Sequence, residues 1–231
     1  FNIFLFLIPI CILVTGERSN FLKSIMLFFL IIYFINPKQL IISKIKIVII
    51  LLFGIFLTIN LNQNLLTKQT EFFKRILIVN DAKNFEEKFQ NIIYFAHYDA
   101  AINIFKDYPL NGVGNKNFRK KCSDEKYLNE NLKFSVKRCS THPHQIHFEI
   151  LAEQGMLGYL IFFYLVISFI YNNVRINIPI KNLFFNSVNF YLIIFLIPIL
   201  PGGSVFSSFN GTLFWLIFSI ANYQNQFLKK N

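Results

Sequence analysis

The chain has 231 residues, of which 54% are hydrophobic, and it carries thirty phenylalanines and a formal net charge of +11. This apolar content indicates a membrane protein, so the positive charge is not evidence of a nucleic-acid partner. The basic residues instead indicate which connectors face the cytoplasm.

Six apolar runs approach the roughly 20 residues that a helix needs to cross a bilayer. We therefore predict an all-α integral membrane protein with about six transmembrane helices, similar to other polytopic membrane proteins. The chain begins inside an apolar run, without Met or a charged leader, so we interpret it as the C-terminal half of a longer protein with its first helix truncated. The runs cover residues 1–15, 20–35, 40–59, 148–171, 183–200 and 211–227.

The distribution of Lys and Arg divides the chain into three parts. Short basic connectors, such as the one with Lys38, Lys44 and Lys46, are typical of cytoplasmic loops. The long polar segment then faces outward. We predict three transmembrane helices in residues 1–59, a large helical periplasmic loop in residues 60–143, and three further helices in residues 144–231.

The first polar motif is Thr15-Gly16-Glu17-Arg18, at the outer end of the first apolar run. A charged pair between membrane helices is costly unless it is paired, reaches water or has a function. Arg18 could bind a phosphate through two parallel hydrogen bonds. The alternative is an ordinary polar turn with an interfacial ion pair to Glu17.

The periplasmic loop combines a helical part and an irregular part. Between Thr67 and Lys106 apolar residues recur every three or four positions, which predicts two amphipathic helices near the membrane surface, separated near Asn80-Asp81. After them, Pro109, Gly112 and Gly114 predict tight turns, which could cradle a phosphate or be plain turns. The loop also holds three arginines that are candidate anion ligands, Arg75, Arg119 and Arg138.

Two cysteines, Cys122 and Cys139, lie in the same loop. In an oxidising periplasm they could form a disulfide, and the alternative is two free thiols.

The most informative segment is His142-Pro143-His144-Gln145, where the loop returns to an apolar run. Pro143 fits the first turn of a helix, which would place His144 in that turn, where the helix dipole disfavours a charged imidazole. A histidine that is neutral near pH 7 can act as a base. A metal site is disfavoured, because the neighbouring carboxylates lie one to three turns deeper.

Helical spacing sorts the following residues into two faces. Gln145, Glu149 and Glu153 share one face, and a second face is lined by His144, His147, Leu151, Gly155 and Gly158. The glycines would allow a helix or a lipid chain to approach closely. The alternative is that these glycines serve packing alone and that the histidines only decorate an interface.

Together, these motifs resemble the O-antigen ligase and polymerase superfamily. The resemblance rests on Thr15-Gly16-Glu17-Arg18, on the segment from Tyr108 to Gly114 with Phe118, and on His144-Gln145 followed by nine residues and Gly155. It covers most of the chain. Many members carry Ser where this chain has Glu17, which weakens the phosphate role of the adjacent arginine.

The resemblance implies a GT-C-like membrane glycosyltransferase of the bacterial inner (plasma) membrane, with its active site facing the periplasm. Such enzymes transfer a glycan from undecaprenyl diphosphate to an acceptor, with no cofactor or metal. His144 and Arg18 would be catalytic, and the donor chain would lie near Gly155 and Gly158. The residues expected to bind substrate are Gln145, Arg119, Gly155, Gly158, Gly112, Gly114 and His142.

Four functions remain open at this point. We expect ligation of O-antigen to lipid A-core, as part of lipopolysaccharide biosynthesis in the cell envelope. The alternative within the superfamily is a polysaccharide polymerase that joins repeat units, with a glycan acceptor. A transporter or flippase and a non-catalytic sensor or scaffold are more distant alternatives, and membrane lipids are expected partners of all four.

Overall fold

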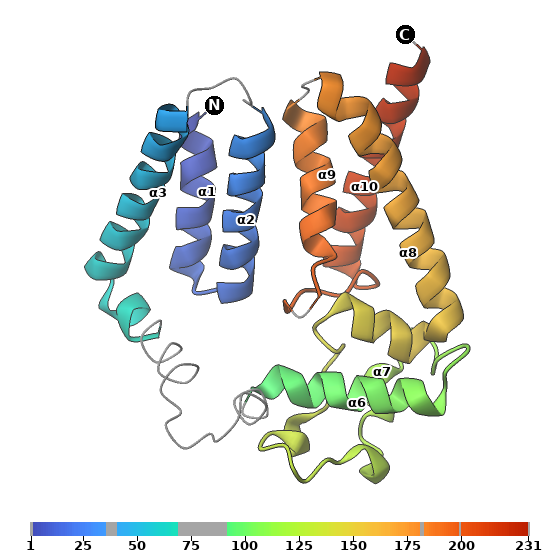
Figure 1. Ribbon diagram of the computed structural model, residues 1–231. Coiled ribbons are helices and arrows are strands. Elements are labelled where there is room, and N and C mark those ends of the chain that lie inside the picture. Colours follow the sequence, from blue (N-terminus) through green and yellow to red (C-terminus); the bar gives the residue numbers. More distant parts are fainter. Residues whose placement is uncertain (1, 36–40, 69–91, 181–182, 199, 231) are drawn as a thin grey trace. The chain divides into compact units, whose positions relative to one another are not determined.

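The computed structural model describes residues 2–35, 41–68, 92–180, 183–198 and 200–230, and every regular element assigned within them is a helix (Figure 1). The all-α fold class is therefore confirmed for the described part of the chain. The chain divides into two compact units, Phe1–Asp81 with Asn177–Ile194, and Ala82–Ile176 with Phe195–Asn231.

The first unit is built from four apolar helices, which are α1 (Asn2–Thr15), α2 (Arg18–Ile35), α3 (Ile41–Leu61) and most of α9 (Leu183–Phe195). Gly16, at φ 77°, makes the turn between α1 and α2, a conformation that glycine adopts without strain. Gly54 of α3 faces the side chain of Ile10 on α1. Phe34 of α2 packs against Phe190 of α9, with ring centres 5.2 Å apart.

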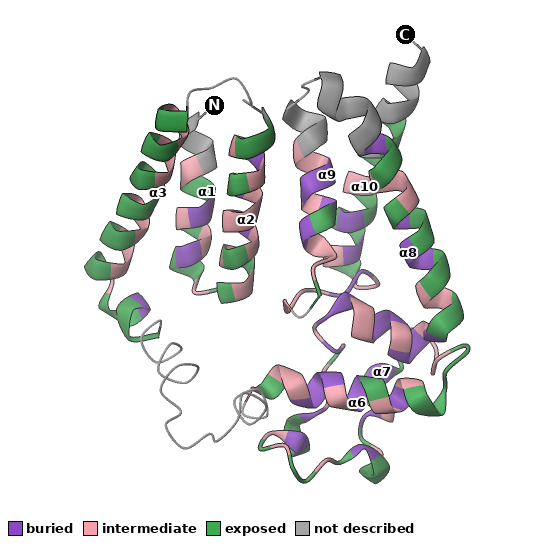
Figure 2. Cartoon of the chain, in the orientation of Figure 1, coloured by how far each residue is buried: buried purple, intermediate pink, exposed green. Residues whose placement is uncertain are grey.

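A helix lies over each of the six apolar runs predicted from the sequence. Two helical segments, Ile41–Leu61 and Ile146–Asn173, are long and apolar enough to cross a membrane, and Phe6–Thr15 and Ser208–Ile220 are shorter apolar helices. Many apolar side chains of α3 are exposed (Figure 2), including Ile49 at 58% and Phe53 at 60%. Such exposure is expected of a surface that faces lipid. Six spans remain a prediction.

The second unit contains α6 (Ile93–Asp107), the short α7 (Phe118–Lys121), most of α8 (Ile146–Ile180) and α10 (Ser208–Lys230). Single 3-10 turns lie at Glu125–Tyr127 and Ser135–Lys137. Rings of α8 and α10 pack together, and those of Phe169 and Phe218 are 4.2 Å apart.

The apolar face of α6 is covered by protein. Its residues form a buried core with α7 and the start of α8, which comprises Ala100, Ala101, Ile104, Phe118, Cys122, Tyr127 and Ala152. The predicted helical periodicity from Ala96 to Ile104 is thus correct, but this face packs on the chain's own core, where a membrane surface was expected. The other helix predicted in this loop, before Asn80, falls mostly on residues 69–91, outside the described residues.

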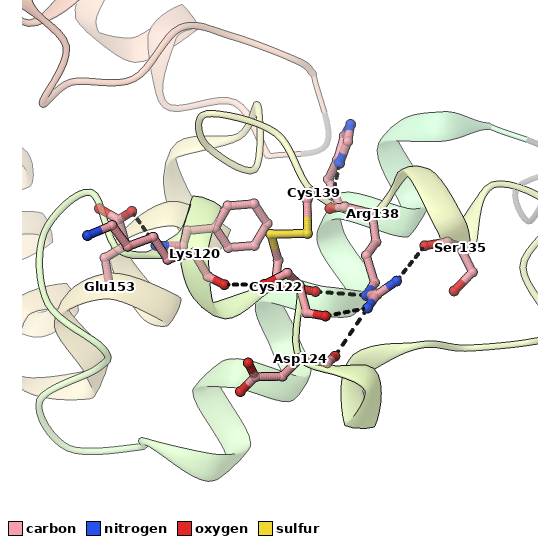
Figure 3. The surroundings of a disulfide bond; sticks show 10 residues. Lys120, Cys122, Asp124, Ser135, Arg138, Cys139 and Glu153 are labelled. Carbon is pink, nitrogen blue, oxygen red and sulfur yellow. Dashed lines mark hydrogen bonds between the residues drawn. A yellow bond between two sulfur atoms is a disulfide. The ribbon is translucent and has the colours of Figure 1, made fainter.

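A disulfide joins Cys122 and Cys139, with 5.4 Å between their Cα atoms, and Arg138 lies buried beside it (Figure 3). The Arg138 guanidinium donates to the carbonyl oxygens of Cys122, Ser123, Asp124 and Ser135, at 2.8 to 3.4 Å. The sequence left Arg138 open as an anion ligand. In the structure these four bonds occupy most of its donors and hold the loop together.

Candidate active site

The histidine segment precedes a helix but is not part of it. Helix α8 begins at Ile146, and the Gln145 side chain caps it by accepting hydrogen bonds from the backbone N–H groups of His147, at 2.7 Å, and Phe148, at 3.2 Å. His144 has φ 60°, in the left-handed region that side-chain-bearing residues seldom adopt. The predicted helical start at Pro143 is therefore wrong, because Gln145 supplies the cap two residues later.

Gly202, from the loop before α10, fixes this segment in place. Its N–H donates to the carbonyl oxygen of His144 at 2.7 Å, and its own carbonyl accepts a hydrogen bond from His142 Nε2 at 3.2 Å. The unusual backbone of His144 is thus held by a contact 58 residues further along the chain. Strained backbone of this kind is concentrated at functional sites.

Three imidazole rings meet at this point. The ring of His144 lies 4.4 Å from that of His142 and 5.3 Å from that of His97 on α6, measured between ring centres, and Tyr94 packs against it at 5.5 Å. Burial, together with the neighbouring His142 and His97, lowers the pKa of His144 to about 4. Burial also lowers the pKa of His142. The lowered pKa favours the neutral imidazole expected for His144, and its causes are burial and the two histidine neighbours.

The hydrogen bonds distinguish His144 from the other three histidines. His97 Nδ1, His142 Nε2 and His147 Nε2 each lie within 3.2 Å of a backbone carbonyl, which accepts only, so each of these nitrogens carries the proton. His144 Nε2 instead pairs with the Ser140 hydroxyl at 2.8 Å, which can donate or accept. This partner therefore allows either neutral tautomer of His144.

The face shared by Gln145, Glu149 and Glu153 points inward, and all three are at most 2% exposed. The carboxylate of Glu153 accepts the backbone N–H groups of Lys116, at 2.7 Å, and Phe118, at 3.1 Å. Glu149 accepts hydrogen bonds from Ser204 and from the backbone of Val205. These acids anchor two different loops to the first turns of α8.

The turn from Pro109 to Gly114 docks into a break in α8. At Gly155, with φ 66° and ψ −167°, the helix is interrupted. The N–H groups of Met156 and Leu157, which begin the second half, donate to Pro109 and Leu110 at 2.8 and 3.2 Å. The carbonyls that end the first half, those of Ala152 and Glu153, accept from Val113 and Gly114 at 3.0 and 2.8 Å.

Gly112 and Gly155 lie where two stretches of backbone approach too closely for a side chain. A Cβ on Gly112 would overlap the backbone of Glu153 and Gln154, and one on Gly155 would overlap the Leu110 carbonyl. Gly155 thus meets the Pro109 turn, where a lipid chain was expected. A Cβ on Gly158 would meet Gln154 of the same helix, and the N–H of Gly114 already bonds to Glu153.

The remaining predicted arginines lie in different surroundings. Arg119 is exposed on α7, near the carboxylate of Glu153. Arg18 begins α2 in the first unit, where its Nη2 donates to the carbonyl of Lys68 at 3.0 Å. Arg75 falls outside the described residues. The sequence interpretation did not identify His97, Ser140 and Gly202 as site residues, because they come from segments that only the fold brings together.

The described residues thus combine apolar helices with a cluster of three histidines just before α8, His97, His142 and His144. Comparison with known families is more specific. A family model described as O-antigen ligase matches residues 3–163, and the chain belongs to this family of glycosyltransferase-like membrane proteins. No curated protein and no solved structure matches the chain.

Proposed function

We propose that this protein transfers a glycan from a lipid diphosphate carrier to a sugar hydroxyl, with His144 as the general base. The observation that supports this most directly is the His144 imidazole itself, whose pKa is lowered and whose Nε2 pairs with the Ser140 hydroxyl at 2.8 Å. Family membership supports the class of reaction. The donor proposed from the resemblance is an undecaprenyl diphosphate-linked glycan.

The step moves one proton and exchanges one bond. The acceptor hydroxyl gives its proton to His144, and its oxygen forms a bond to the anomeric carbon of the donor sugar. The bond from that carbon to the phosphate oxygen breaks, and its electron pair leaves with the diphosphate. Because the pKa of His144 is lowered to about 4, the base is unprotonated near pH 7 without a metal or cofactor.

The departing diphosphate needs positive charge, and Arg119, in the same unit as His144, is the proposed source. The catalytic role of Arg18 rests on the resemblance alone. A groove of about 570 Å³ lies beside Lys116, three residues before Arg119, and its wall includes Ser207, Thr212 and Trp215. Polar and apolar lining together suit a carrier with an anionic head and an apolar chain. Glu153 fixes the backbone of Lys116 and Phe118 and so positions this basic turn.

The preferred acceptor is lipid A-core, and the proposed site faces the periplasm from a chain with about six spans in the inner membrane. The disulfide between Cys122 and Cys139 supports an oxidising compartment for this loop. A polymerase that extends the glycan would use the same step with a sugar acceptor. The reaction product distinguishes the ligase from the polymerase.

The test compares His144→Gln with His147→Gln in the full-length protein reconstituted with radiolabelled lipid diphosphate glycan and lipid A-core. Loss of a general base lowers the rate by about 10²- to 10⁴-fold. His147→Gln is the matched control, since it makes the same exchange three residues later, and it should retain transfer. A wild-type rate from folded His144→Gln would refute the assignment.

The position of the label decides between the candidate functions. Label on lipid A-core supports the ligase, and label in a longer polymer supports the polymerase. Movement of the lipid-linked sugar across the bilayer with no new glycan product would instead support a flippase.

A further inference from the structure

His97 is the third imidazole of the cluster, and the proposed reaction does not yet use it. It lies on α6, is 4% exposed, and donates a hydrogen bond from Nδ1 to the carbonyl oxygen of Arg138 at 2.8 Å. That bond fixes the plane of the ring. The ring centre is then 5.3 Å from that of His144.

The acceptor of this bond is itself rigidly held. The Arg138 guanidinium donates to four carbonyl oxygens, and the next residue, Cys139, is tied to Cys122 by the disulfide (Figure 3). The disulfide-bonded loop is thereby connected through Arg138 and His97 to the ring of His144.

We infer that His97 is a positioning residue, which holds the His144 imidazole in the orientation needed for proton transfer and opposes its protonation. The inference rests on the proposed role of His144 as the base. His97 would not touch the substrate. It acts on the reaction only through His144.

The surroundings of His144 explain why its protonation is opposed. The groups that face it are Tyr94 and His97 from α6, Ser140 and His142 from its own segment, and the backbone of Gly202. None of these carries a negative charge at neutral pH that would favour a charged imidazole. A proton on His97 repels one on His144, and this repulsion contributes to the lowered pKa of His144.

The central experiment is a histidine NMR titration of the full-length protein with His97→Asn. The amide nitrogen of Asn can replace Nδ1 as donor to Arg138, while the titrating ring is lost. At 5.3 Å, Coulomb's law with the dielectric constant of water predicts that the titration midpoint of His144 rises by about half a pH unit. An unchanged midpoint would overturn the inference.

Enzyme kinetics test the orienting role separately. His97→Ala should lower kcat with little change in the KM for the lipid donor, and His97→Asn should recover most of the loss, because it restores the donor to Arg138. A raised KM with unchanged kcat would contradict the inference. His147→Asn is the control, since it removes a histidine that is bonded to Leu196 and should leave the His144 midpoint unmoved.

The two readouts separate the inference from the function it rests on. If His144→Gln leaves transfer intact, the proposed base is wrong, yet a shifted His144 midpoint in His97→Asn would still support the coupling between the rings. If His144→Gln abolishes transfer and the midpoint does not shift, the base is supported and the role of His97 is refuted.

Discussion

Gly155→Ala tests whether the break in α8 is built as the hydrogen bonds indicate. At φ 66° and ψ −167°, Gly155 occupies a region that is almost exclusive to glycine, so a side chain there costs about 1–3 kcal/mol in backbone strain. The new Cβ would also overlap the Leu110 carbonyl and displace the Pro109 turn.

Displacement of that turn removes further stabilisation. The N–H groups of Met156 and Leu157 would lose their acceptors, at about 1 kcal/mol each. We therefore expect Gly155→Ala to lower the free energy of unfolding by about 3–5 kcal/mol, the sum of the strain and the two lost bonds.

The assay is unfolding in mixed micelles with increasing SDS, followed by circular dichroism. Gly54→Ala is the matched control. Gly54 lies in the regular part of α3, where a Cβ meets only the flexible end of Ile10, and the gain in helix propensity is about 1 kcal/mol. A loss below about 1 kcal/mol for Gly155→Ala, within the range of ordinary surface substitutions, would refute the description of the break.

Three further predictions concern the loop and its histidines. Reduction of the disulfide, or the double substitution Cys122→Ser and Cys139→Ser, should lower the free energy of unfolding by about 3 kcal/mol, as expected for a loop of 17 residues. The same unfolding assay, with and without reductant, measures this loss. Arg138→Met should lower the free energy of unfolding by several kcal/mol, since it leaves buried carbonyls without donors. An effect as small as that of the exposed Arg119→Met would contradict the role of the Arg138 guanidinium in holding the loop together. The pKa of His144 is lowered in the folded state, so the unfolded chain binds more protons below pH 6.5. The free energy of unfolding should therefore fall as the pH drops from 6.5 towards 4. In a His144→Gln variant it should depend less on pH.

The sequence predicted the helices well, but part of the reasoning that singled out His144 was incorrect. Long apolar runs have few alternatives to helix, so all six predicted runs contain one. The start of α8 was misplaced because the preference for proline in the first turn competes with capping by Gln145, and no local pattern shows that His144 adopts a left-handed backbone. That conformation depends on Gly202, which only the folded chain brings near.

The spacing from Gln145 to Gly155 has a structural meaning that sequence patterns did not reveal. The nine residues between them form the first part of α8, which is about 13 Å long at 1.5 Å per residue. This short helix begins at the histidine segment held by Gly202 and ends at the break that receives the Pro109 turn. Its buried acids bind loops at intermediate points, Glu149 near Ser204 and Glu153 at Lys116.

A change in the length of that helix would therefore affect both ends. Insertion of one residue would rotate Gly155 by about 100° relative to His144, since a helix has 3.6 residues per turn, and the Pro109 turn and the Gly202 loop could no longer both dock. The fixed spacing of the motif thus follows from geometry. It keeps the basic turn that carries Lys116 and Arg119 at a constant distance from the imidazole of His144.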